Sequence, residues 1–177
     1  MRAPPIPHIE PERLRELRES CLLDSPPEER FDRITRLAQR SFDVPIALVS
    51  LVDEDRQWFK SRQGLGATET PRHVSICGHT ILEGDVFCVE DTLKDDRFND
   101  NPLVVDEPKI RFYAGCPLHS TEGFALGTLC IIDVKPRVFD QNDRQSLRDL
   151  AQMAEAEIQR SAPLNGEDGA TLNGVTR

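Results

Sequence analysis

The segment of residues 75–82, SICGHTIL, places a thiol and an imidazole two positions apart, at Cys77 and His79. Both residue types are rare in this chain, which has five cysteines and four histidines. A pair of this kind could be a nucleophile with its base, half of a metal site, part of a ligand pocket or plain core packing. The positions of the surrounding elements distinguish these four uses.

A catalytic dyad needs the two side chains within hydrogen-bond reach and a third group that orients the base. The segment is predicted to be a short helix over residues 75–83, ending at Gly84. On a helix, residues two apart point in directions that differ by roughly 200° and do not face each other. The sequence also places no Asn or Asp to orient His79. These features disfavour a dyad, and no catalytic residue is predicted.

A metal site is equally poorly supported by the spacing of the possible ligands. Structural zinc sites take four ligands, usually in closely spaced pairs such as C-x-x-C. The chain contains no C-x-x-C, and its histidines lie at positions 8, 73, 79 and 119. The sequence therefore predicts neither a metal nor another cofactor.

Core packing and a ligand pocket remain open for this segment. Free cysteine often behaves as a small buried hydrophobe, and Gly78 would permit close backbone approach, for which Trp58 or Phe59 are candidate neighbours. A small-molecule site needs apolar and aromatic walls with a few polar groups. The residues that we single out as pocket candidates are Arg56, Trp58, Cys77, His79, Arg97, Phe98, Arg111, Tyr113 and Cys116.

Composition restricts the environment and the partners. The chain has 177 residues and a net charge of −9, which argues against binding to a nucleic-acid backbone or an anionic membrane surface. No apolar run approaches the roughly 18 residues that cross a bilayer. Five cysteines without paired spacing favour free, mostly buried thiols in a reducing compartment. We therefore expect a cytoplasmic protein.

Hydrophobic periodicity predicts the elements that position these residues. Apolar stripes at helical spacing indicate helices near residues 12–22, 25–42 and 141–160, the last capped by Asp140. Short apolar runs indicate strands at 45–52, 56–63, 86–90, 110–120 and 124–133. Closely linked strands favour antiparallel pairing, so we expect an α+β fold with an antiparallel sheet and helices gathered on one face.

The chain is predicted to have three parts. Residues 1–24 form an N-terminal extension and helix, whose proline-rich start is expected to be mobile. Residues 25–160 form one domain, and residues 161–177 are expected to be a disordered tail or a linker because they are small, polar and rich in glycine.

Four phrases in this order resemble the GAF domain, a small sensory module. They are ERFDRITRLAQRSFDVPIALVSLVDEDRQWFKSRQGL, SICGHTIL, IRFYAGCPL and ALGTLCIIDVKPRVFDQNDRQSLRDLA. The resemblance covers roughly residues 25–160. It implies a central antiparallel sheet with the N- and C-terminal helices on one face, and a short helix with a long loop over a pocket on the other. Bacterial members of this kind are commonly found ahead of diguanylate cyclase or histidine kinase output domains.

This resemblance implies a sensory or regulatory module in bacterial signal transduction that is not itself an enzyme. It would bind an unknown small molecule or a partner protein and relay the signal through its terminal helices, where many members form homodimers, to an output domain. One alternative is a ligand-free dimerisation scaffold. Another is an enzyme resembling the free methionine sulfoxide reductases of this family, with Cys77, Cys88 and Cys116 as its thiols. Family members that attach bilins carry a Cys directly followed by His, whereas here Gly78 intervenes.

Overall fold

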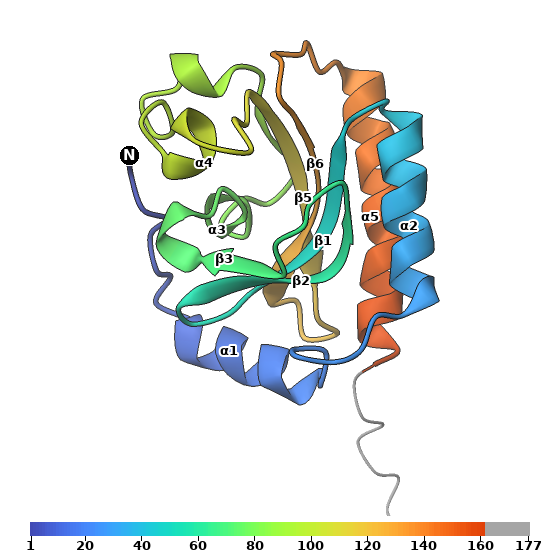
Figure 1. Ribbon diagram of the computed structural model, residues 1–177. Helices are drawn as coiled ribbons and strands as arrows, with labels where there is room; N and C mark the ends of the chain where they lie inside the picture. The colour runs from blue at the N-terminus through green and yellow to red at the C-terminus, as the bar shows by residue number, and fades with distance from the viewer. Residues whose placement is uncertain (162–177) are drawn as a thin grey trace, which may run out of the picture.

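The computed structural model describes residues 1–161 and contains a six-stranded antiparallel sheet (Figure 1). The strands are β1 (Ile46–Val52), β2 (Arg56–Gln63), β3 (Glu69–Pro71), β4 (Phe87–Val89), β5 (Phe112–His119) and β6 (Ala125–Asp133), in the spatial order β3-β2-β1-β6-β5-β4. The α-helices are α1 (Glu10–Glu19), α2 (Glu29–Ser41), α3 (Cys77–Thr80), α4 (Pro102–Val105) and α5 (Gln141–Gln159), and the single 3₁₀ turns are η1 (Arg72–Val74) and η2 (Thr92–Lys94).

The two faces of the sheet are covered by different structures (Figure 1). The long helices α2 and α5 lie side by side on one face, which we call the helix face. The short helices α3 and α4 and the connections around them cover the other, which we call the cavity face. Helix α1 crosses one end of the sheet instead of joining α2 and α5. The predicted α+β fold with a central antiparallel sheet is confirmed.

Alternation along the central strands divides the core between the two faces. In β6, Leu129 and Ile131 pack under the helices, while Cys130 and Ile132 point to the cavity face. This is the period of two that a strand buried on both sides must show. On the helix face, Phe31, Ile34 and Ala38 of α2 are fully buried. The sheet is therefore a partition between two separate apolar clusters.

Helix α5 begins where the sequence predicts. The Asp140 side chain accepts hydrogen bonds from the backbone N–H groups of Asn142 and Asp143, at 2.8 and 2.9 Å. The Asp143 side chain returns a bond to the Asp140 N–H, which completes a capping box. Asp133, at the end of β6, accepts hydrogen bonds from the Val134 N–H and the Arg137 guanidinium, both at 2.6 Å, and so holds the turn that follows the strand.

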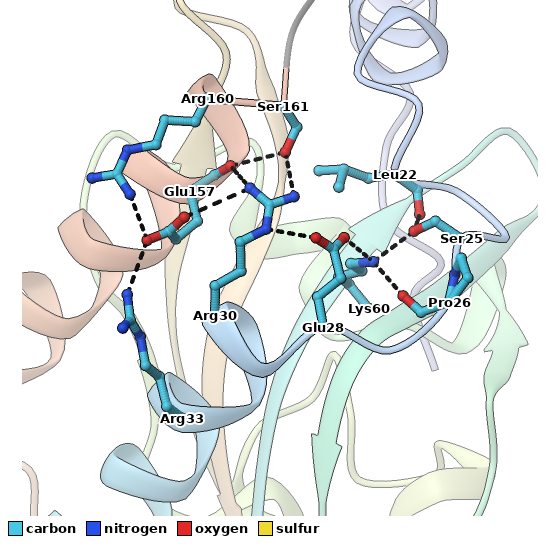
Figure 2. A network of polar contacts seen from close by, with 10 residues as sticks. All are labelled: Leu22, Ser25, Pro26, Glu28, Arg30, Arg33, Lys60, Glu157, Arg160 and Ser161. Carbon is cyan, nitrogen blue, oxygen red and sulfur yellow. Dashed lines mark hydrogen bonds and ion pairs between the residues drawn. The ribbon is translucent and has the colours of Figure 1, made fainter.

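A polar network around two buried charges, Glu157 and Lys60, joins α2 to α5 and β2 (Figure 2). The Glu157 carboxylate of α5 is 6% exposed and lies within 4 Å of three arginines, with Arg33 at 3.1 Å and Arg160 at 2.9 Å. Arg30 also pairs with Glu28, whose carboxylate contacts the fully buried Lys60 ammonium of β2 at 2.7 Å. Each charge has a partner, as burial requires. The network holds α2 and α5 against each other and against the sheet.

A second buried charge cluster fixes α1. Arg13 donates two hydrogen bonds to the Glu10 carboxylate, at 2.8 and 2.6 Å, and Arg72 of η1 donates to the same carboxylate. All three side chains are less than a tenth exposed. An amphipathic pattern cannot indicate such a cluster, because each of these residue types is normally solvent-exposed.

The structure corrects one local prediction and adds two short elements that the sequence does not predict. The proline-rich residues 1–9, which we call the N-terminal arm, lie along α3 instead of forming a mobile extension, and Pro4 is buried there. Residues 69–71 form the short strand β3, which pairs with the edge of β2. The polar stretch before β5 contains α4, whose start is capped by Asn101.

The predicted tail, residues 161–177, lies outside the described residues except for Ser161. Within residues 1–161, every helix is too short or too polar to cross a membrane.

Candidate functional site

A cavity of about 280 Å³ lies on the cavity face, between the sheet and the segments around α3 and α4. Its walls are mostly apolar. They are formed by Ile46, Leu48, Phe59, Leu65, Ala67, Ile76, Leu103, Pro108, Ile110 and Ile132, together with Cys77 and Tyr113. Ile46 and Leu48 of β1 point into the cavity, and the residues between and after them, Ala47 and Val49, point to the helix face, because side chains alternate along a strand.

Polar groups in the cavity are few. Gln57, Thr70 and Glu107 complete its lining. The side-chain oxygen of Gln57 accepts a hydrogen bond from the Ser75 hydroxyl, which holds the side-chain amide in place. The Thr70 hydroxyl is buried and has no hydrogen-bond partner among the described residues. Ala67 and Glu107 are exposed, so the mouth lies between the β2–β3 turn and the loop after α4.

At the inner wall of the cavity, Cys77 is the centre of a buried polar cluster. The hydroxyl groups of Tyr113 and Thr128 each donate to its sulfur at 3.2 Å. The sulfur of Cys130, on the middle of β6, lies 3.7 Å from that of Cys77. Ser50 lies 3.1 Å from Thr128, oxygen to oxygen, and extends the cluster into β1. Four elements of the chain therefore converge on one thiol.

The position of Tyr113 depends on a glycine in the same strand. A Cβ atom at Gly115 would lie 2.3 Å from the Tyr113 hydroxyl oxygen, closer than such atoms approach. Gly115 thus leaves the space over β5 in which the phenol ring lies. The Tyr113 hydroxyl also lies 2.8 Å from Thr80 Oγ1 at the end of α3. This contact and the bond to Cys77 tie α3 to the sheet at both ends.

The electrostatics of the cluster distinguish its two thiols. Burial raises the pKa of Cys77, but its side-chain hydrogen bonds with Cys130 and the neighbouring hydroxyls outweigh burial and lower that pKa to about 7. Its hydrogen bond with Cys77, together with burial, raises the pKa of Cys130 well above the ordinary value for a thiol. Burial likewise raises the pKa of Tyr113. Cys77 is therefore the thiol of the cluster that ionises most readily, while Cys130 and Tyr113 stay protonated at neutral pH.

His79 points away from the cavity, on the opposite side of α3 from Cys77. Its Nε2 lies 3.1 Å from the carbonyl oxygen of Arg2, and its ring packs edge-on against Phe98 with centroids 5.0 Å apart. Burial is the main cause that lowers its pKa. The predicted separation of Cys77 and His79 by helical geometry is confirmed. The imidazole contacts the N-terminal arm and is not a base for the thiol.

The arm approaches α3 closely where Gly78 stands. A Cβ atom at Gly78 would lie 2.6 Å from Pro4 Cγ, so the close neighbour of this glycine is the arm and not Trp58 or Phe59. The Arg2 N–H donates to the Arg97 carbonyl at 2.9 Å, and the N-terminal amine pairs with Asp100. Helix α3, which covers the cavity, therefore lies between the sheet and the arm.

The other pocket candidates lie elsewhere. Trp58 packs against the core of the helix face, because β2 alternation turns Gln57 and Phe59 toward the cavity in its place. Phe98 is fully buried on the cavity face but does not line the cavity. The arginines form surface ion pairs: Arg56 with Asp24, Asp53 and Glu69, Arg97 with Asp95, and Arg111 with Asp91. Of the nine candidates, the cavity brings together Cys77 and Tyr113.

The thiols proposed for a reductase-like enzyme do not meet. Cys116 and Cys88 pack against the core of the helix face, on the opposite side of the sheet from Cys77. Burial raises the pKa of each to about 11, which keeps both protonated at neutral pH. Among residues 1–161, no group of three or more His, Cys, Asp or Glu side chains could hold a metal ion.

Sequence reasoning missed Cys130 and the polar residues Gln57 and Thr70. The signal for Cys130 was present, since alternation in LGTLCIID places it on the same face as Ile132. Gln57 could have been found in the same way from the alternation RQWFKS. Thr70 could not, because its position depends on the short edge strand β3.

Comparison with known proteins agrees with this architecture. A sequence model of the GAF domain family matches residues 26–158. A protein of Pseudomonas aeruginosa named cyclic di-GMP phosphodiesterase is 43% identical over 159 residues, which cover 89% of this chain. The chain spans only 27% of the length of that relative.

Solved structures share the fold at low sequence identity. The GAF domain of an Acinetobacter phosphoenolpyruvate-protein phosphotransferase superposes with a TM-score of 0.62 at 16% identity, over 85% of this chain and 94% of that one. A free methionine-R-sulfoxide reductase from Neisseria meningitidis gives a TM-score of 0.61 at 22% identity, over 86% and 91%. The family model and the sheet topology together show that the chain belongs to the GAF domain family.

Proposed function

We propose that this GAF domain is a sensory module of a signalling protein and acts by binding a small ligand in the cavity of the cavity face. The observation that carries the proposal is the cavity itself, a preformed space of about 280 Å³ with an apolar wall and a few polar groups. Sites for small molecules are typically concave, apolar and largely preformed. A cavity of about 150 Å³ with a similar apolar lining is already large enough to bind benzene.

The lining indicates the chemical class of the ligand. Gln57 offers an amide and Thr70 an unpartnered hydroxyl, whereas the acid at the mouth is Glu107. Among residues 1–161, no Lys or Arg lines the cavity. An anion would therefore lose its hydration without gaining a cationic partner. We infer a small neutral ligand, mostly apolar, with one or two polar atoms, and not a cyclic dinucleotide with two phosphate charges.

The contacts of α3 suggest a route for the signal. Ile76 and Cys77, at the start of α3, line the cavity, while Gly78 and His79 contact the N-terminal arm. A ligand that displaces α3 would change the fit of the arm, which leads directly into α1. Coupling of this kind is typically worth about 1–3 kcal/mol. We propose that the arm and the terminal helices carry ligand occupancy to an output domain or partner protein.

A thermal-shift measurement with a matched pair of variants tests the binding proposal. The expected result is that small neutral probes such as indole raise Tm of the wild-type chain, while cyclic GMP and cyclic di-GMP do not. Ile132→Phe, which adds volume inside the cavity, should abolish the shift. Leu37→Phe, the same kind of change on the exposed side of α2, should keep it. The absence of a shift with every neutral probe would instead favour the ligand-free scaffold.

We also propose that the outer surface of α2 and α5 forms a homodimer. Leu37 of α2 and Met153 of α5 are 45% and 44% exposed on the two adjacent helices. Burying such side chains against a second copy would contribute favourably to association. Light scattering of the double variant Leu37→Glu and Met153→Glu should then report a monomer at concentrations where the wild-type chain is a dimer. A monomeric wild-type chain would end this proposal.

A further inference from the structure

The polar cluster around Cys77 contains more than ligand binding requires. A cavity wall of this size needs no thiol that accepts two hydroxyl hydrogen bonds, nor a second thiol beside it. Cys77 and Cys130 come from α3 and β6, 53 positions apart in the sequence, and lie with their sulfurs 3.7 Å apart.

We propose that Cys77 and Cys130 form a redox modification site, in which a hydroperoxide oxidises Cys77 and Cys130 then closes a disulfide. The inference goes beyond the proposed ligand binding and does not depend on it. A redox-sensing thiol needs thiolate character, access to the oxidant and a neighbouring thiol that resolves the oxidised sulfur. The structure supplies all three.

Hydrogen bonds supply the first requirement. Tyr113 and Thr128 direct their O–H groups at the Cys77 sulfur, both at 3.2 Å. Such donors stabilise a thiolate and not a neutral thiol. This geometry agrees with the pKa of about 7 at Cys77, whereas Cys88 and Cys116, without such donors, have pKa values raised by burial. Within the cluster, Cys77 is therefore the thiol that reacts first.

The cavity supplies access. Cys77 is only 2% exposed to bulk solvent, but it forms part of the cavity wall. The cavity reaches the exposed residues Ala67 and Glu107 at its mouth. Hydrogen peroxide has only two heavy atoms and is neutral, so the acidic mouth and the apolar wall do not exclude it. Cys130 is fully buried and is not part of the wall, which makes it the resolving thiol.

The two chemical steps balance. In the first, the Cys77 thiolate attacks one peroxide oxygen, the O–O bond breaks, and the released hydroxide takes a proton from solvent to form water. Cys77 is then a sulfenic acid. In the second, Cys130 loses its proton and attacks the Cys77 sulfur, and the S–O bond breaks to release a second water. Overall, two thiols and one peroxide give one disulfide and two waters. The sulfurs must approach by roughly 1.7 Å, from 3.7 Å to the disulfide length.

Disulfide mapping of the full chain tests the proposal. The reduced chain is treated with hydrogen peroxide at pH 7, its free thiols are alkylated under denaturing conditions, and the peptides are identified by mass. Trypsin alone is insufficient, because it leaves Cys77 with Cys88 on one peptide and Cys116 with Cys130 on another. A second protease that cleaves after glutamate separates the members of both pairs. The expected product is a Cys77–Cys130 peptide that dithiothreitol reduces.

Two variants assign the roles of the thiols. Cys130→Ala should yield no linked peptide and should accumulate a Cys77 sulfenic acid that dimedone traps. Cys116→Ala, which removes a buried thiol on the opposite face, should form the linked peptide at the wild-type rate within about twofold. The proposal is overturned if Cys77 and Cys130 of the wild-type chain are both still reduced, and therefore alkylated, under conditions that have oxidised the exposed Cys21.

The pH dependence of the Cys77 oxidation rate distinguishes a reactive thiol from a cluster that only stabilises the fold. The rate of Cys77 oxidation should reach half of its maximum near pH 7. Tyr113→Phe removes one donor, and if the pKa rises by one unit, the thiolate fraction at pH 7 falls from a half to about a tenth, an approximately fivefold loss of rate. A wild-type rate that still rises beyond pH 8.5, as for an ordinary thiol, would contradict the proposal.

Discussion

The two faces of the sheet are built from the same strands but serve different ends. On the helix face, α2 and α5 close over a continuous core, and the Glu157 and Glu28 carboxylates fix the helices by paired charges (Figure 2). On the cavity face, single-turn helices leave about 280 Å³ unfilled and a thiol is held among hydroxyl groups. The helix face therefore provides stability. The cavity face is less completely packed, and the unfilled space is the candidate ligand site.

The largest difference is expected from deleting one leucine on each face. Leu129→Ala, under α5, should lower the free energy of unfolding by about 3–5 kcal/mol, because it opens a new cavity in a closed core. Leu48→Ala enlarges a cavity that already exists, so we expect only about 2 kcal/mol. Urea unfolding measures both values. Equal losses would remove the proposed contrast in packing.

A smaller effect is expected within the charge network of the helix face. Glu157→Gln keeps the shape but removes the buried negative charge that pairs with three arginines, and should cost about 1–2 kcal/mol. The matched change is Arg160→Ala, which removes the most exposed of these partners at 69% exposure and should cost at most about 0.5 kcal/mol. If Arg160→Ala destabilises the chain as much as Glu157→Gln, the burial of the carboxylate is not what matters.

The same network predicts a pH dependence. Hydrogen bonds from Arg30 and Lys60 lower the pKa of Glu28 from 4.5 to about 2. The folded state therefore gains stability from the ionised carboxylate above about pH 4.5, and this gain is lost as the pH falls toward 2. Glu28→Gln should destabilise the chain at pH 7, and the difference from wild type should shrink between pH 4.5 and 2. A difference in urea midpoints that stays constant over this range would contradict the assignment.

The smallest effect tests the cavity face. Thr70→Val removes a buried hydroxyl without a partner among the described residues, so the chain should lose nothing and gain up to about 1 kcal/mol. Thr128→Val, the same change at a hydroxyl that contacts Cys77 and Ser50, should cost about 1–2 kcal/mol. Thermal unfolding of the two variants side by side distinguishes them. Destabilisation by Thr70→Val would indicate that this hydroxyl has a structural partner.

The contrast between the faces also explains what the sequence could predict. Periodicity and capping indicated α2, α5 and the central strands, because each buries a regular stripe against a large core. Single-turn helices such as α4, and the edge strand β3, depend on contacts distant in sequence and carry no periodic signal. Trp58 was assigned to the pocket by its residue type, but strand alternation turned it to the helix face. The arm at Pro4 could not be predicted, because only the fold brings it to Gly78.

The central claim is that one face of this sheet receives a small neutral molecule and the other does not. The δ1 methyl groups of isoleucine report both faces in one NMR titration with indole, since Ile46, Ile76, Ile110 and Ile132 line the cavity and Ile34, Ile131 and Ile158 lie in the core of the helix face. Saturable chemical-shift changes are expected only at the four cavity methyls, and Ile132→Phe should abolish them at the remaining three. Saturable shifts of equal size on both faces, or no saturable shift at any of the seven methyls, would contradict the claim.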